Sequence, residues 1–138
     1  MKHLIYRVLV MLSIAGLLLP GCGPKPETPQ KVNPITLESI EGTDFQRLIL
    51  TEKAAERLGI QTAEVDGANV PYAAVIYDTE GNTWVYTNPA PLTYVRAPIL
   101  VDRVEGDQAI LSQEMDPKVD VVIVGVSELY GAETGVSK

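Results

Sequence analysis

Pairs of acidic side chains close together in the sequence are the first candidates for chemistry. Asp78 and Glu80 form one pair, and Glu114 and Asp116 form another. Two carboxylates can hydrolyse a glycoside, but the acid of such a pair needs an apolar pocket that raises its pKa. Both pairs stand in segments that predict turns, where acidic residues are common. We therefore assign no catalytic residue and expect that the protein is not an enzyme.

Oxygen-bearing side chains also alternate at Asp78, Glu80 and Asn82, which is faintly like a calcium-binding loop. The downstream bidentate Glu and the central Gly spacing of such a loop are missing. A tight hairpin turn is the better interpretation of this segment.

Side chains that bind transition metals are scarce. The only histidine is His3 and the only cysteine is Cys22, and beyond the first 21 residues the only methionine is Met115. If the first 21 residues are removed and Cys22 is modified, neither a histidine nor a free thiol remains. Metal sites built on His and Cys, histidine-based triads and cysteine nucleophiles are then excluded, so we expect no metal and no cofactor.

The first 21 residues have the pattern of a secretory signal. Lys2, His3 and Arg7 form a short basic region, and an apolar stretch follows from Val8 to Leu19. This stretch is shorter than the roughly 20 apolar residues that a membrane-spanning helix needs. We expect the segment to be removed.

The segment Leu19-Pro20-Gly21-Cys22 resembles the processing site of bacterial lipoproteins, which the lipoprotein signal peptidase recognises. The resemblance implies a signal peptide over residues 1–21, a diacylglycerol thioether on Cys22 and attachment to a membrane through that lipid. The protein would lie in the cell envelope, on the outer membrane or on the outer face of the plasma membrane. The alternative is a secreted protein with a chance cysteine.

Residues 22–34 predict an extended tether, because they contain four prolines and almost no apolar side chain. The whole chain has a formal net charge of −7, and removal of the two cations Lys2 and Arg7 makes it −9. No run of Lys or Arg remains, which argues against a nucleic-acid partner.

Residues 35–138 predict a single, mainly β domain, a small antiparallel barrel or sandwich with one short helix. Thr51 to Leu58 is the helix, with Thr51 as N-cap and Gly59 just past its end. Everything after the helix predicts strands and turns. The expected strands are Ile35–Ile40, Phe45–Leu50, Ile60–Val65, Tyr72–Tyr77, Thr83–Thr87, Leu92–Arg103, Gln108–Leu111 and Val119–Val124.

The strongest predicted hairpin joins Tyr72–Tyr77 to Thr83–Thr87 through a turn at Asp78–Asn82, with Trp84 and Tyr86 on one face and Val85 on the other. Asn88–Pro91 is expected to break the sheet, and Pro98 to mark an edge or a bulge. The aromatic residues in this region could stack on a ligand, but a role in the core is more common in small β domains. They are Tyr77, Trp84, Tyr86 and Tyr94.

Several segments resemble, in order, the C-terminal part of periplasmic adaptor subunits, the membrane fusion protein family that serves resistance-nodulation-division efflux pumps. The matching segments are Leu50–Val65, Val70–Tyr77, Gly81–Thr87, Tyr94–Val101 and Asp116–Glu133. Arg96 stands at the arginine of the family's "f-x-R-x-pV-x-V" strand. The resemblance covers about residues 48 to 133 and implies a membrane-proximal-like β domain that packs against a transporter or a neighbouring adaptor.

The chain departs from the family between Val65 and Val70. Adaptors carry their lipoyl-like halves and α-helical hairpin there, whereas this chain has only Asp66-Gly67-Ala68-Asn69. It therefore lacks the segment with which adaptors reach the outer-membrane channel.

The sequence thus favours a non-enzymatic, lipid-anchored envelope protein that binds or modulates a transmembrane transport complex. Its expected partners are a transporter or a full-length adaptor subunit, and the candidate core and interaction residues are Tyr77, Trp84, Tyr86, Tyr94 and Arg96. The alternative is a lipoprotein that binds a small ligand or metal and delivers it to a transporter.

Overall fold

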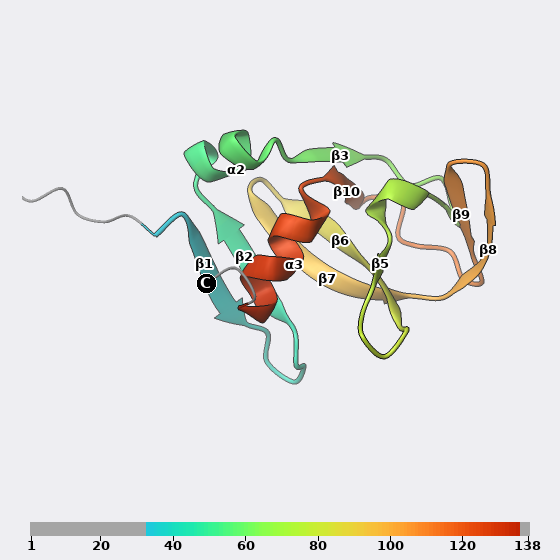
Figure 1. Ribbon diagram of the computed structural model, residues 1–138, viewed down its shortest axis with the longest axis horizontal. Coiled ribbons are helices and arrows are strands. Elements are labelled where there is room, and N and C mark those ends of the chain that lie inside the picture. The colour runs from blue at the N-terminus through green and yellow to red at the C-terminus, as the bar shows by residue number, and fades with distance from the viewer. Residues whose placement is uncertain (1–32, 136–138) are drawn as a thin grey trace, which may run out of the picture. The chain divides into compact units, whose positions relative to one another are not determined.

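Two antiparallel sheets and two helices make up residues 33–135, which are the residues that the computed structural model describes (Figure 1). The predicted mainly β class is confirmed. The two sheets do not close into a barrel within the described residues. The predicted signal peptide and residues 22–32 of the predicted tether lie outside this range.

The larger sheet has seven strands in the order β1-β2-β7-β6-β10-β3, and every neighbouring pair is antiparallel. A short strand, β5, pairs with the first residues of β6. The strands are β1 (Ile35–Ser39), β2 (Gln46–Leu50), β3 (Gln61–Ala63), β5 (Ile76–Tyr77), β6 (Thr83–Ala90), β7 (Thr93–Ile99) and β10 (Asp120–Val124).

The smaller sheet has three strands in the order β4-β9-β8. They are β4 (Asn69–Pro71), β8 (Val101–Glu105) and β9 (Gln108–Leu111). The chain passes from the larger sheet to the smaller one at Leu100, whose carbonyl accepts a hydrogen bond of 2.8 Å from the backbone of Ser112. The predicted strand Leu92–Arg103 is therefore two strands, β7 and β8, in different sheets.

Apolar side chains cover both faces of the larger sheet and form two separate clusters. Tyr86 lies in the cluster that α2 (Glu52–Leu58) and α3 (Val126–Thr134) cover, which we call the helix-side core. Val85, the preceding residue of β6, lies in the cluster with residues of β4 and β9, which we call the sheet-side core. The predicted alternation along this strand is confirmed, and it follows from the two-residue period of a strand.

Helix α2 agrees with the prediction in its position and in both caps. The Thr51 hydroxyl accepts a hydrogen bond of 3.2 Å from the backbone of Ala54. Gly59 ends the helix in the left-handed conformation, with φ of 63°. Ala54 is buried in the helix-side core, and Ala55 and Leu58 pack against that core. The predicted apolar face of the helix is therefore the face that meets the sheet.

Helix α3 was not predicted, since everything after α2 was expected to be strand or turn. It follows Gly125 without a side-chain cap, and it contains Gly131, which is a poor helix former. Its buried residues are Val126 and Leu129, three positions apart on one face. Burial of this face against the sheet outweighs the weak local preference for a helix.

The predicted strand Tyr72–Tyr77 is also wrong in its first half. Tyr72–Ala74 forms a 3₁₀ turn, η1, which closes with a hydrogen bond of 3.1 Å from the backbone of Val75 to the carbonyl of Tyr72. The turn places Ala74, which has no exposed surface, in the sheet-side core. The hairpin therefore keeps only the two residues of β5 on this side of the turn.

The prediction that Asn88–Pro91 breaks the sheet is wrong. Strand β6 continues to Ala90, with an irregular register between Thr87 and Ala90. The Asn88 side chain donates to the carbonyls of Ala90 and Thr93, at 2.8 and 2.9 Å. These bonds stabilise the irregular segment, so that the chain reverses at Pro91 and Leu92, before β7 begins.

Pro98 lies inside β7, but at a point where one edge of the strand has no partner among the described strands. β2 pairs with β7 only from Thr93 to Val95. Beyond Val95 only β6 pairs with β7, and Pro98 lies opposite Trp84. A proline is tolerated at such a local edge because no ladder hydrogen bond is needed there.

Candidate functional site

The turn between β5 and β6 is built around the carboxylate of Asp78. This carboxylate accepts bonds of 2.9 Å from the backbones of Glu80 and Asn82 and from the Asn82 side chain. The indole nitrogen of Trp84 donates a fourth bond, of 3.0 Å. The bonds, chiefly that from the Asn82 side chain, lower the pKa of Asp78 to about 2. The predicted hairpin turn is confirmed, and Asp78 is an ionised turn residue.

Trp84 is fixed on three sides. Besides the bond to Asp78, its ring meets the ring of Phe45 edge to face, with centroids 5.4 Å apart and planes at 71°. The guanidinium carbon of Arg96 lies 4.7 Å from the Trp84 ring centroid. A cation over an indole face is the most favourable cation–π arrangement. These contacts hold the Trp84 side chain in one orientation.

Arg96 stands at the centre of an aromatic and acidic cluster, which we call the Arg96 cluster: Phe45, Trp84, Tyr86, Arg96, Tyr130 and Glu133. Its guanidinium also lies 5.6 Å from the ring of Phe45 and 5.7 Å from that of Tyr130. Its Nε is 3.3 Å from Oε2 of Glu133 on α3, without the alignment of a hydrogen bond. The side chains of Arg96 and Glu133 are only 16% and 4% exposed, so solvent screens this ion pair weakly.

Tyr86, on β6, is the last member of the cluster and contacts Glu133. Its hydroxyl donates a hydrogen bond to Oε2 of Glu133, and its side chain is fully buried. Burial, and then the bond to the Glu133 carboxylate, raise the pKa of Tyr86 far above its ordinary value. Tyr86 therefore stays a neutral hydrogen-bond donor that joins β6 to α3.

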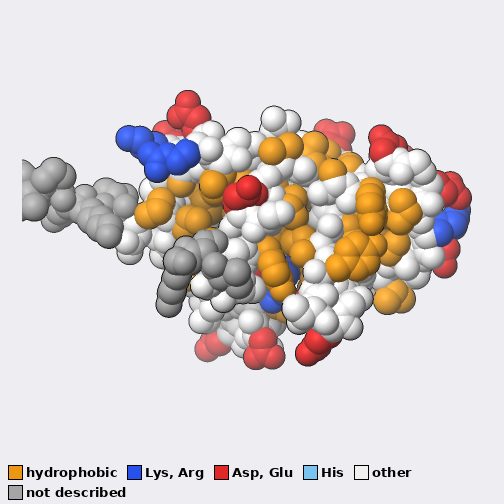
Figure 2. Space-filling model, viewed as in Figure 1, with side chains coloured by type: hydrophobic (Ala, Val, Ile, Leu, Met, Phe, Trp, Pro, Cys, Tyr) orange, Lys and Arg blue, Asp and Glu red, His pale blue; other side chains and the backbone are white. Residues whose placement is uncertain are grey.

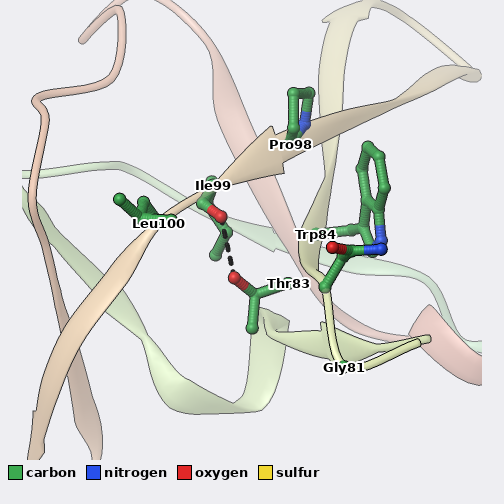
Figure 3. Close-up of a pocket in the computed structure, with 7 residues that line it drawn as sticks. Gly81, Thr83, Trp84, Pro98, Ile99 and Leu100 are labelled. Atoms are coloured by element: carbon green, nitrogen blue, oxygen red, sulfur yellow. Dashed lines mark hydrogen bonds between the residues drawn. The ribbon is translucent and has the colours of Figure 1, made fainter. Parts of the chain in front are cut away.

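An open pocket of about 410 Å³ lies beside this cluster, and Figure 3 shows its walls. We call it the Trp84 pocket. Trp84 and Pro98, which are register partners on β6 and β7, point to the same side of the sheet (Figure 3). Leu100, which lies between β7 and β8, is 68% exposed. The remaining lining residues are Gly81, Asn82, Thr83 and Ile99.

The lining of the Trp84 pocket is suited to binding rather than to proton transfer. Its lining residues include the aromatic Trp84, the proline Pro98 and the aliphatic Leu100. The Thr83 hydroxyl already donates a bond of 2.7 Å to the carbonyl of Ile99 (Figure 3). Such a surface takes an apolar side chain by contact and desolvation.

The structure separates the five residues that the sequence singled out. Trp84, Tyr86 and Arg96 come together in the Arg96 cluster. Tyr94 is buried in the helix-side core, where desolvation raises the pKa of its hydroxyl. Tyr77 lies elsewhere, half exposed on β5 near the exposed Tyr72 of η1. Figure 2 shows hydrophobic side chains gathered over these two elements.

Phe45, Tyr130 and Glu133 of the Arg96 cluster were not among the candidate residues, and neither were the lining residues of the Trp84 pocket other than Trp84. Pro98 was expected only to mark an edge or a bulge. The alternation of Trp84 and Tyr86 along β6, combined with the correct register to β7, would have placed Pro98 and Arg96 opposite them. No local signal pairs Glu133 with Arg96, because that contact depends on the unpredicted helix α3.

Among residues 33–135, no three His, Cys, Asp or Glu side chains are grouped closely enough to hold a metal ion. Met115 packs against the sheet-side core. Neither helix in this range has the length and hydropathy needed to cross a bilayer. Leu19, Pro20, Gly21 and Cys22, which the sequence assigns to processing and lipidation, lie outside the described residues.

No protein-family model, no curated protein and no solved structure matches this chain.

Proposed function

We propose that the chain is a lipid-anchored, non-catalytic envelope protein whose β domain binds a component of a transmembrane transport complex at the Trp84 pocket. The pocket is the observation that carries the proposal. Its indole wall is held by Asp78, Phe45 and Arg96, so little conformational freedom is lost when a partner binds. Its rim residue Leu100 is the most exposed large apolar side chain among those described.

The arrangement of the adaptor-like segments supports the choice of partner. The segments that resemble periplasmic adaptors contain β5 and β10 and most of β6 and β7. In the larger sheet β6 lies between β7 on one side and both β5 and β10 on the other. Segments that are dispersed in the sequence are thus contiguous in the fold. The proposed partner is accordingly a transporter or a full-length adaptor subunit.

The acidic side chains Asp78 and Glu133 make structural contacts, which supports a non-catalytic role. Both oxygens of Asp78 accept hydrogen bonds within the hairpin turn. The Glu133 carboxylate accepts a hydrogen bond from Tyr86 and forms an ion pair with Arg96. Each of these two carboxylates therefore holds other residues in place.

The lipid anchor rests on the sequence around Cys22 and has its own test. The full chain is expressed in a bacterium, purified from membranes in detergent and weighed by intact mass spectrometry. We expect residues 22–138 with an added diacylglycerol group. A chain that lacks this added mass on Cys22 would contradict the anchor.

The partner is tested in native membranes. The full chain carries an affinity tag after Lys138 and is chemically crosslinked before purification, and mass spectrometry identifies what is bound. Leu100→Asp is expected to abolish recovery of a transporter or adaptor, because a charge at the pocket rim disfavours an apolar contact. Val104→Asp, at another exposed apolar residue on β8, is the matched control and is expected to retain the partner. Equal recovery with both variants would exclude the Trp84 pocket as the binding site.

A small-ligand role is the second candidate, and the volume of the pocket favours it. About 410 Å³ lies within the range of small-molecule sites. Native mass spectrometry of the purified full chain distinguishes the two functions. A bound small molecule that is lost in Trp84→Ala and retained in Tyr77→Ala would replace the transport-partner proposal.

A further inference from the structure

The two halves of α3 are held to the sheet in different ways. Val126 and Leu129, in its first four residues, are the buried residues of the helix. Farther along, Tyr130 and Ala132 are only partly buried, and Glu133 makes the polar contacts to Tyr86 and Arg96. The second half of α3 therefore depends on the Arg96 cluster more than on apolar burial.

Arg96 contacts both the helix and the pocket. One guanidinium lies 4.7 Å from the ring centroid of Trp84, which forms a wall of the pocket. The same side chain lies 3.3 Å from Glu133 and 5.7 Å from the ring of Tyr130, both on α3. Arg96 therefore links Trp84 in the wall of the pocket to Tyr130 and Glu133 on α3.

We propose that Glu133 is a positioning residue for the Trp84 pocket: by holding the Arg96 guanidinium against the indole, it couples the docking of the second half of α3 to the shape of the pocket. The inference concerns regulation of the same pocket and rests on the proposed function. A partner that fixes Trp84 would also stabilise the docked helix, and a partner that displaced the helix would loosen the pocket. Thermodynamic linkage requires this reciprocity.

Loss of the Glu133 charge explains how the coupling would act. An arginine without its carboxylate is better hydrated when it turns toward solvent, since a partly buried charge without a partner is costly. That movement removes the cation from the face of Trp84. The indole then loses one of its three supports, and the last residues of α3 lose the ion pair that links them to β7.

Trp84 is the only tryptophan in the chain, so its fluorescence reports on the pocket directly. The full chain is purified in mild detergent, and two quantities are measured: quenching of Trp84 fluorescence by acrylamide, and hydrogen exchange of the backbone amides of residues 130–135. For Glu133→Gln we expect quenching to rise at least about twofold and exchange about tenfold, as loss of a charge-assisted contact predicts. Glu128→Gln, at an exposed position of the same helix, is the matched control and is expected to change neither quantity.

Arg96→Lys separates coupling from simple loosening. Lysine keeps the positive charge near Glu133 but cannot stack a planar guanidinium on the indole. We expect this variant to raise Trp84 quenching while exchange in α3 stays near that of the unchanged protein. If Glu133→Gln raised exchange in α3 and left Trp84 quenching unchanged, or if Arg96→Lys left quenching unchanged, the coupling would be refuted. Because the measurement needs no partner, its result is independent of whether the proposed transport partner is found.

Discussion

At the scale of single residues, hydrogen bonds decide which side chains remain free for binding. Asp78 has the residue type of a catalytic or calcium-binding group, yet all its described contacts organise the turn and hold Trp84. The sequence predicted the turn from composition alone. It could not predict the bond to Trp84, because that bond requires the register of β5 against β6. Likewise, Arg96 was a candidate because its segment resembles a family motif, but only the fold pairs it with Glu133.

Asp78→Asn tests the role of this carboxylate through its pH dependence. The folded-state pKa of about 2 lies below the ordinary value of 3.8, so the bonds to the ionised form add stability that is fully present above about pH 4. That stability is lost as the pH falls toward 2. We expect the variant to have a lower Tm than the unchanged protein at pH 6, and the difference to shrink as the pH approaches 2.

Thermal unfolding followed by circular dichroism checks this pH dependence. Glu80→Gln is the control, since the Glu80 carboxylate makes only a 3.4 Å contact with Asn82. A Tm difference between Asp78→Asn and the unchanged protein that stayed constant down to pH 2 would argue against the assigned role.

Tyr86→Phe tests the buried bond between β6 and α3. The variant removes one hydroxyl and leaves the buried Glu133 carboxylate without that donor, which costs about 1–3 kcal/mol of unfolding free energy. Urea unfolding measures the loss. Tyr77→Phe, at a half-exposed tyrosine, should change the free energy by less than about 0.5 kcal/mol. Equal effects of the two substitutions would mean that the Tyr86 hydroxyl contributes nothing to docking α3.

At the scale of elements, the sequence predicted those helices and strands that have strong local signals. It did not predict those whose form depends on tertiary packing. Helix α2 was predicted because Thr51 and Gly59 mark its ends chemically. Helix α3 has no side-chain cap and only a narrow buried face, so its helical form depends on the sheet beneath it. The 3₁₀ turn η1 was also not predicted, because it depends on the packing of Ala74 in the sheet-side core.

Gly125→Ala tests the junction between β10 and α3. Gly125 has φ of 87°, and a Cβ there would collide with the end of the Ile60 side chain. The left-handed backbone and the collision together should cost about 2 kcal/mol or more. Gly106→Ala, with φ of 63° and open space around it, should cost only about 1 kcal/mol. Urea unfolding of both variants gives the comparison, and an equal cost would show that the contact with Ile60 is relieved without strain.

At the scale of the whole molecule, the described residues form three layers: two helices, a seven-stranded sheet and a three-stranded sheet. The sequence predicted most strands and the mainly β class because alternation and turn residues are local. It did not predict the division into two sheets, which depends on where the chain leaves β7. The segment Asp66–Asn69 is a tight turn closed by bonds between Asp66 and Asn69.

The central claim is that a transport component binds at the Trp84 pocket, and site-specific photocrosslinking tests it most directly. A photoreactive residue replaces Leu100 in the full, tagged chain in its native membranes, and a second strain carries it at Val104, which is also an exposed apolar residue. The account predicts a covalent product with a transporter or a full-length adaptor from position 100 and none from position 104. Products of equal yield from both positions, or no such product from position 100, would contradict it.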